Sequence, residues 1–254
     1  MTAINESIEY NIFNIPTILL MSWFVWFIII VMFFLTIKKF RIIPSGIQNL
    51  TEYILDTIYN LSDSIIGDHN ESKKYYPLFV NIFLFIFFSN LLGLIPGLIS
   101  PTSSLNTTLA IAIVVFIFYH YQGIKKYGFN YIKHFFTQIN LKTVPIIMKL
   151  PMAIFGYIII PIIELISHMA RPLSLSVRLF GNILAKEVLL GILSMLVIVF
   201  IGLQNPFIKI ILTISPIILR PLIILLGVLV SLIQAGVFLI LSMIYISGAV
   251  MMEE

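Results

Sequence analysis

The stretch Pro161–Leu190, PIIELISHMARPLSLSVRLFGNILAKEVLL, sets charged residues into an otherwise apolar run. Its polar side chains recur every three or four residues, at Glu164, His168, Arg171, Ser174, Arg178, Asn182 and Lys186. This spacing predicts one polar stripe along a helix. A charge at membrane depth costs about 2.5 kcal/mol or more, so such residues rarely lie there without a role. The stripe therefore predicts either the wall of an aqueous ion path or a polar seam between helices.

The composition of the whole chain predicts a membrane protein. Of its 254 residues, 60% are hydrophobic and 10% are charged, whereas soluble domains carry about 25% charged residues. The mean hydropathy is +1.09. The chain has no cysteine, which excludes disulfides and thiolate metal sites. The basic residues flank apolar segments, so membrane topology explains the pI of about 9.2 better than nucleic-acid binding does.

The apolar pattern predicts an all-α polytopic membrane protein that forms a single membrane domain over residues 1–254. About three upright spanning helices are expected, together with one amphipathic helix and a hairpin of two long, strongly tilted helices. The amphipathic helix is expected either in the membrane interface or packed on protein as a surface helix. The predicted ranges are 17–37, 76–95 and 105–122 for the spans, 45–66 for the amphipathic helix, and 150–200 and 210–250 for the hairpin.

The basic residues predict the orientation of these helices. Of the 15 lysines and arginines, ten fall in the proposed inner segments and one, Lys209, falls in an outer loop. Inner loops of membrane proteins carry this excess. The N-terminus is therefore expected outside and the C-terminus in the cytoplasm. The ten inner residues are Lys38, Lys39, Arg41, Lys73, Lys74, Lys125, Lys126, Lys133, Lys142 and Lys149.

The segment 150–200 has two possible arrangements. As one helix it would extend about 75 Å at 1.5 Å per residue, far more than the roughly 30 Å of hydrocarbon in a bilayer. Two upright spans would place Arg171, Arg178 and Lys186 together in an outer loop, against the charge bias. We therefore expect one tilted helix that bends near Pro172, which cannot donate to the carbonyl of His168.

Two motifs carry a resemblance to a known family. SLSVRLFGNILAKE at residues 174–187 resembles the signature of subunit a of rotary F-type ATP synthases, and SNLLGLIPG at residues 89–97 is similar to the same family. The resemblance implies a non-catalytic, ion-translocating subunit of a bacterial inner membrane, without a cofactor, a metal or catalytic residues. It also implies three partners: a ring of c subunits, b-type peripheral stalk subunits and the rest of the ATP synthase.

The resemblance also assigns roles to individual residues. Arg178 is the essential cation that separates two offset half-channels and holds each ring carboxyl in its ionised form; the alternative is a buried arginine that ties helices together through Glu164 or Glu187. The alternatives for the channel residues are interhelical hydrogen bonds and, at the inner end, an interfacial ion pair of Glu164 with Arg171. The outer half-channel residues are Asn90, Asn182, Lys186, Glu187 and Gln234, and the inner ones are Glu164, Ser167 and His168.

The chain departs from the family at two positions. Members usually carry a small residue where this chain has Lys186, and several place an ionisable residue where it has Gly227, seven residues before Gln234. This chain therefore carries the charge on the first helix of the hairpin, at Lys186, rather than on the second helix, at position 227. Two further classes stay open, a secondary ion transporter and a structural membrane protein whose charges only join helices, and the coupling ion is either H⁺ or Na⁺. Repeated halves, which are frequent in secondary transporters, do not occur in the sequence.

Overall fold

The computed structural model describes residues 16–38, 44, 46–95, 97–129, 131, 159–202 and 206–251. The regular elements in these ranges are helices, and five of them are long and apolar enough to span a membrane. The predicted class, an all-α polytopic membrane protein, is confirmed. The elements are α2 (Thr17–Lys38), α3 (Ile47–Ile66), α4 (His69–Leu92), the short 3₁₀ helix η1 (Pro101–Ser103), α5 (Leu105–Tyr127), α8 (Ile160–Ile201) and α9 (Pro206–Val250).

Helix α4 begins seven residues before the predicted 76–95 range. The Asp68 carboxylate accepts a hydrogen bond from the Asn70 backbone amide at 2.9 Å, which caps the helix. Lys74 and Glu71 then form an ion pair of 3.2 Å within the first turns. Charged residues that pair with each other on an exposed turn extend a helix beyond its apolar run, and hydropathy alone does not detect such a start.

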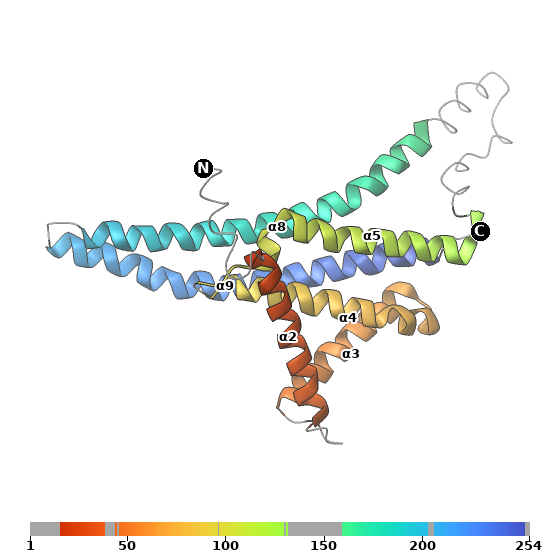
Figure 1. Ribbon diagram of the computed structural model, residues 1–254, viewed down its shortest axis with the longest axis horizontal. Helices are drawn as coiled ribbons and strands as arrows, with labels where there is room; N and C mark the ends of the chain where they lie inside the picture. Colours follow the sequence, from red (N-terminus) through yellow and green to blue (C-terminus); the bar gives the residue numbers. More distant parts are fainter. Residues whose placement is uncertain are drawn as a thin grey trace.

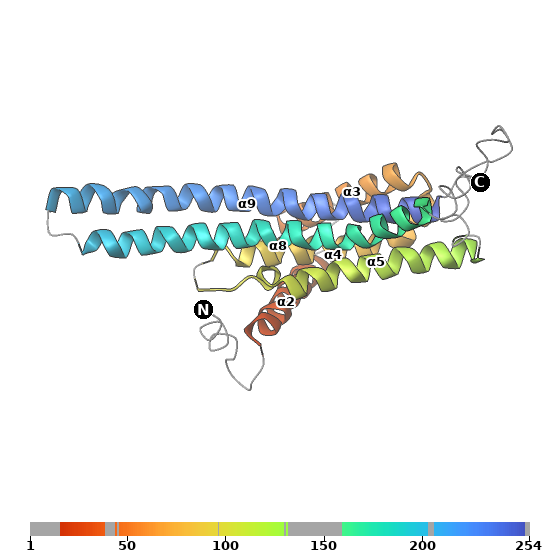
Figure 2. The same ribbon diagram turned by 90° about the horizontal axis from the view of Figure 1, so that it is seen from above.

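Helices α8 and α9 form a long antiparallel hairpin. Figures 1 and 2 show them side by side along the longest axis of the molecule, while α2 crosses the hairpin direction steeply. Helix α8 is continuous over 42 residues, so Arg171–Lys186 do not form a loop. Its ribbon bends in the half that contains the start of the helix, away from the turn that leads to α9 (Figure 1). Pro172 lies inside the helix, as a proline-induced kink requires. Residues 150–158 of the predicted range lie outside the described residues.

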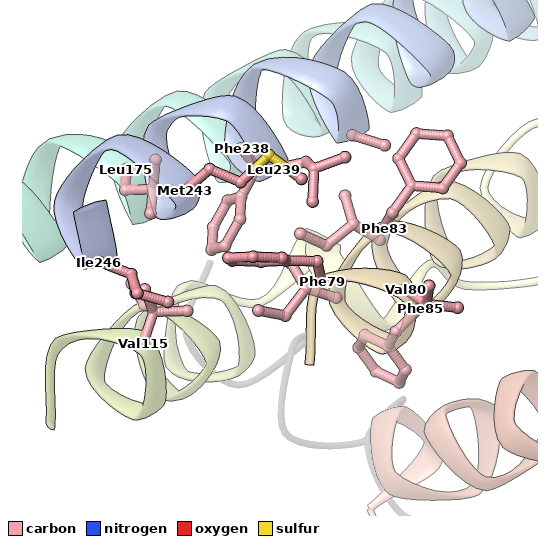
Figure 3. Close-up of a cluster of buried hydrophobic side chains, with 14 of the residues drawn as sticks. Phe79, Val80, Phe83, Phe85, Val115, Leu175, Phe238, Leu239, Met243 and Ile246 are labelled. Carbon is pink, nitrogen blue, oxygen red and sulfur yellow. The ribbon is translucent and has the colours of Figure 1, made fainter. Parts of the chain in front are cut away.

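The apolar core lies where α4 and α5 pack against the hairpin. Figure 3 shows Phe79 and Phe83 of α4 facing Phe238 and Met243 of α9, and Val115 of α5 beside Ile246. Helix α2 joins this core through Trp26, whose ring lies 5.6 Å from that of Phe85. The same packing holds one side of α8 through Leu175, Leu179 and Ile183, all at most 3% exposed. The opposite side of α8 is therefore left uncovered.

Helix α3 packs on protein along one face. Tyr76 of α4 donates to the Leu55 carbonyl at 3.2 Å, and Ser247 of α9 donates to the Ile65 carbonyl at 3.1 Å. The other face leaves Ile47, Leu50 and Tyr53 more than half exposed. Protein packing, one of the two expectations for this amphipathic helix, is thus shown, and the exposed apolar face also suits a position in the membrane interface.

Candidate functional site

The predicted site residues fall into three groups along α8. Glu164, Ser167 and His168 lie in its first turns, Arg178 near its middle, and Asn182, Lys186 and Glu187 further along. At 1.5 Å per residue, about 21 Å of helix separates Glu164 from Arg178, and about 14 Å separates Arg178 from Glu187. Arg178 therefore lies between the other two groups, at the place a barrier between two half-channels would occupy.

Arg178 lies on the uncovered side of α8. Its side chain is exposed, and within the described residues its guanidinium makes no hydrogen bond or ion pair. Small residues surround it on that side, since Ala170, Ser174, Gly181 and Ala185 are all exposed at spacings of three or four residues. Small residues let another helix approach closely in a membrane. The expected alternative, a buried arginine tied to Glu164 or Glu187, does not describe this exposed side chain.

Asn182 and Lys186, two predicted outer half-channel residues on α8, donate hydrogen bonds to side chains of α9. We call this line of contacts the polar seam. Asn182 donates its side-chain amide to the Gln234 carbonyl oxygen at 2.7 Å, and Lys186 donates to the Ser231 hydroxyl at 3.0 Å. Ser231 in turn donates to the backbone carbonyl of Gly227 at 2.7 Å. The residue number increases from 182 to 186 on α8 while the number of its partner decreases from 234 to 231 on α9, as antiparallel packing requires. The seam therefore joins three of the five predicted outer half-channel residues.

Glu187 lies on a different side of α8, against the loop that follows α4. Its Oε1 atom would be 3.5 Å from a Cβ at Gly93, and it has no hydrogen-bond partner among the described residues. Asn90 lies in the last turn of α4 and is joined to this loop, because its Oδ1 accepts from the Thr102 hydroxyl at 2.9 Å and Thr102 contacts Ser100 at 2.8 Å. The uncharged segment 97–104 is thus folded inward against α8, with Ser100 and Thr102 fully buried.

A cavity of about 250 Å³ opens beside Glu187 between α8, α9 and the segment after α4. Its walls include Gly93, Gly97, Ser194 and Arg220. Glu187 thus lines a cavity large enough for several water molecules, although its Oε1 atom is itself buried.

The inner group divides between two sides of α8. His168 is buried and shares a 3.0 Å hydrogen bond through Nδ1 with the Tyr119 hydroxyl of α5, whereas Ser167 is exposed. Glu164 is partly exposed on the same side as His168. Arg171 lies one turn further along, with its guanidinium carbon 5.1 Å from the centre of the Tyr245 ring of α9. This end of α8 therefore shows an aromatic and histidine cluster that joins α5, α8 and α9.

Gly227 is crowded by a side chain of the segment that follows α4. A Cβ at this position would overlap the Leu94 side chain. The ammonium of Lys186 reaches this place from the other helix, because Ser231 links it to the Gly227 carbonyl. The Lys186 side chain on α8 thus lies beside Gly227 on α9.

Two features of the site were not assigned from the sequence. Ser100 and Thr102 sit in an uncharged loop and gave no signal, because only the inward fold of that loop brings them to Asn90. Arg220 is a charged residue within the apolar 210–250 segment, and no role was attached to it from the sequence. Among the described residues, no group of three histidine, aspartate or glutamate side chains is placed to hold a metal ion.

The fold and the site define a multi-span helical membrane protein whose polar residues gather on a long hairpin. The family model of the ATP synthase A chain matches residues 19–247. Among curated proteins, ATP synthase subunit a 1 of Pelobacter propionicus is 41% identical over 229 residues, 90% of this chain and 85% of the relative. ATP synthase subunit a of Geobacter sulfurreducens is 39% identical over the same shares. The chain therefore belongs to the subunit a family of F-type ATP synthases.

Proposed function

We propose that this chain is the ion-translocating stator subunit of an F-type ATP synthase, and that it carries protons to and from carboxyl groups on a ring of c subunits. The observation that carries the proposal is Arg178, an exposed cation without a partner in the described chain, set among small residues on the uncovered side of α8. A charge of this kind at membrane depth needs a counter-ion. A carboxyl at mid-membrane on a neighbouring ring supplies one.

The charge of Arg178 then couples ion flow to rotation. A guanidinium stays protonated at any working pH, and a carboxyl within about 4–6 Å of it favours the ionised form. Each ring carboxyl therefore releases its proton before it passes Arg178 and takes one up after it. The same charge repels cations, which blocks direct leakage between the two half-channels. Each proton that crosses the full field delivers about 2.3 kcal/mol per 100 mV.

The two half-channels are assigned to the groups on either side of Arg178. Asn90, Asn182, Lys186, Glu187 and Gln234 line the outer one, and Glu164, Ser167 and His168 line the inner one. The cavity beside Glu187 supports the outer assignment, since it gives water a route to a carboxylate within the span. The aromatic contacts around His168 equally suit helix packing, so the inner assignment rests mainly on its place beyond Arg178.

The topology of the proposal follows from the number of spans. An odd number of spans, such as the five candidates among the described residues, would leave the two termini on opposite sides of the membrane, and the charge bias of the loops supports an N-terminus outside and a C-terminus in the cytoplasm of a bacterium. A Thr2→Cys variant should be labelled by an impermeant thiol reagent from the outer side, because the natural chain has no cysteine. Labelling from the cytoplasmic side alone would contradict this orientation.

The test of the function is Arg178→Ala in the assembled complex. The variant should co-purify with c-ring and b-type stalk subunits, since Arg178 makes no contact that holds this chain together. Ion-driven ATP synthesis in membrane vesicles should fall to the level of vesicles without the complex. Normal coupled synthesis in this variant would sink the proposal. Co-purification with no ring or stalk subunit, for the natural chain, would favour a secondary transporter instead.

A further inference from the structure

Arg220 of α9 is a membrane-depth charge that the proposed function does not use. Its side chain is partly exposed, and in the described part of the chain it makes no hydrogen bond or ion pair. Its helix is strongly apolar on average from Leu212 to Val250, and Arg220 is the charged residue in that range. A guanidinium remains charged and needs water or an anion around it. The surroundings of Arg220 should therefore show where water enters this part of the hairpin.

Two cavities meet at Arg220. The first is the cavity of about 250 Å³ that also contains Glu187. The second, of about 340 Å³, lies further along the hairpin between Leu193 and Val197 of α8 and Ile217 of α9. Ser194 and Arg220 belong to the walls of both. The two cavities are thus neighbours along one seam between α8 and α9, and each is large enough for several water molecules.

The sequence explains why the helices leave room and polar atoms here. Gly191 on the α8 side of the first cavity has no side chain, and no atom lies within 4 Å of the place where its Cβ would be. On the α9 side, Pro221 has no N–H, so it leaves the Ile217 carbonyl without its usual partner in the helix. The seam therefore offers a free carbonyl, the Ser194 hydroxyl oxygen and a guanidinium, which together can hold a line of water.

We propose that the outer half-channel is entered along the α8–α9 seam, through the second cavity, past Ser194 and Arg220, to Glu187. The proposal rests on the proposed function for its purpose but not for its geometry. Arg220 is the charged residue at the junction of the two cavities and gives the entrance a positive potential. Glu187 lines the adjoining cavity, so the path leads past a guanidinium to a carboxyl group.

The absence of cysteine in the natural chain makes this path directly measurable. A Ser194→Cys variant, in the whole complex in membrane vesicles, is treated from the outer side with two impermeant thiol reagents, cationic trimethylammonioethyl and anionic sulfonatoethyl methanethiosulfonate. The matched control is Met195→Cys, which is next in sequence but 69% exposed on another side of α8 and outside both cavities. Charged reagents attack thiols that water reaches, because the thiolate is the nucleophile.

The proposal predicts fast labelling of Ser194→Cys and little labelling of Met195→Cys. It further predicts that Arg220→Gln slows the anionic reagent and speeds the cationic one at Ser194→Cys. The expected change is about threefold for each, as Coulomb's law gives for unit charges several ångströms apart in water. Equal labelling at positions 194 and 195 would overturn the path. Unchanged reagent preference in Arg220→Gln would overturn the role of Arg220.

The same measurement separates this inference from the proposed function. Labelling at Ser194→Cys does not require rotation, so it should persist in the Arg178→Ala background. If Arg178→Ala keeps normal synthesis while Ser194→Cys labels as expected, the proposed function fails and the path stands. If Arg178→Ala loses synthesis and Ser194→Cys is not labelled, the path fails and the proposed function stands.

Discussion

Arg171 and Arg178 lie two turns apart on the same helix and have opposite surroundings. Arg171 is partly buried, stacks over the Tyr245 ring and lines a small void with Tyr119 and Pro172. Arg178 is exposed and has no such neighbour in the described chain. Residue type and hydropathy do not distinguish these two arginines. The packing of the helices does, because Arg171 has partners within the chain, whereas Arg178 is exposed to a partner outside it. Only the second is expected to take part in ion transfer.

The largest difference should appear when each arginine is replaced by lysine. Arg178→Lys should lose coupled ATP synthesis almost completely, because an ammonium is a compact charge that can lose its proton when it is desolvated. Arg171→Lys should keep most of it, since lysine can also lie over the Tyr245 ring. Synthesis rates in vesicles, normalised to assembled complex, measure both. Equal losses in the two variants would remove the distinction between these arginines.

A smaller effect is expected from Arg171→Ala, and on stability rather than on coupling. The contact with Tyr245 should be worth about 0.5–2 kcal/mol, so the variant should yield less assembled complex and unfold at a lower denaturant concentration. The complexes that do assemble should retain coupled synthesis. Tyr245→Leu is the matched control and should reproduce the loss of yield. Full yield with lost synthesis would instead place Arg171 in the ion path.

A smaller effect than that of Arg171→Ala is expected from the hydrogen-bonded pair Asn182 and Gln234. Gln234→Leu removes the 2.7 Å hydrogen bond to Asn182, which is worth about 0.6 kcal/mol between membrane helices. If the pair only joins the helices, the loss is confined to about threefold in a folding equilibrium. If Gln234 also lines the outer half-channel, Gln234→Leu should slow proton-driven synthesis beyond that, whereas Asn182→Leu with Gln234 retained should slow it less. Equal rates in both variants after correction for yield would make the pair structural.

The smallest effect is expected at Lys186. Its ammonium donates to Ser231 rather than to a carboxylate in the described chain, so Lys186→Gly should leave the complex assembled and active. A protonated Lys186 repels incoming cations, and removal of that charge should therefore raise synthesis most at low outside pH. The measurement is the ratio of synthesis rates at low and high outside pH. Identical ratios in natural chain and variant would show that Lys186 is a tolerated polar residue.

The fold was largely predictable because hydropathy and proline placement dominate it. The continuity of α8 through Arg171–Lys186 followed from helical periodicity and the absence of a loop signal. The early start of α4 did not, because a side-chain cap and local ion pairs set it. The end of α5 also differed from the prediction, since the helix continues to Tyr127 through Gly123, which faces the Tyr131 ring and does not end the helix. Local contacts of this kind cannot be detected from the mean hydropathy of a segment.

The site was predictable as a set of residues but not as an arrangement. The predicted single stripe covers about a third of the helix circumference at 3.6 residues per turn, and the packing divides it. His168 faces α5, Arg178 is uncovered and Lys186 faces α9. Which of these sides is covered depends on where α5 and α9 pack, and sequence spacing along α8 does not contain that information. The same holds for Glu187, whose neighbours come from a loop that carries no charge.

The overlap between a Cβ at Gly227 and Leu94 has a consequence for how this chain can evolve. A larger side chain at position 227 requires the end of the Leu94 side chain to shift, because a Cβ at Gly227 would overlap Leu94 Cδ2. Leu94→Ala would relieve the overlap, but it should cost stability by itself, because Leu94 is buried at 6% exposure. Gly227→His should therefore be less costly in the Leu94→Ala background than in the natural chain, and a double-mutant cycle measures this coupling. The side chain at position 94 therefore constrains which side chains position 227 can carry.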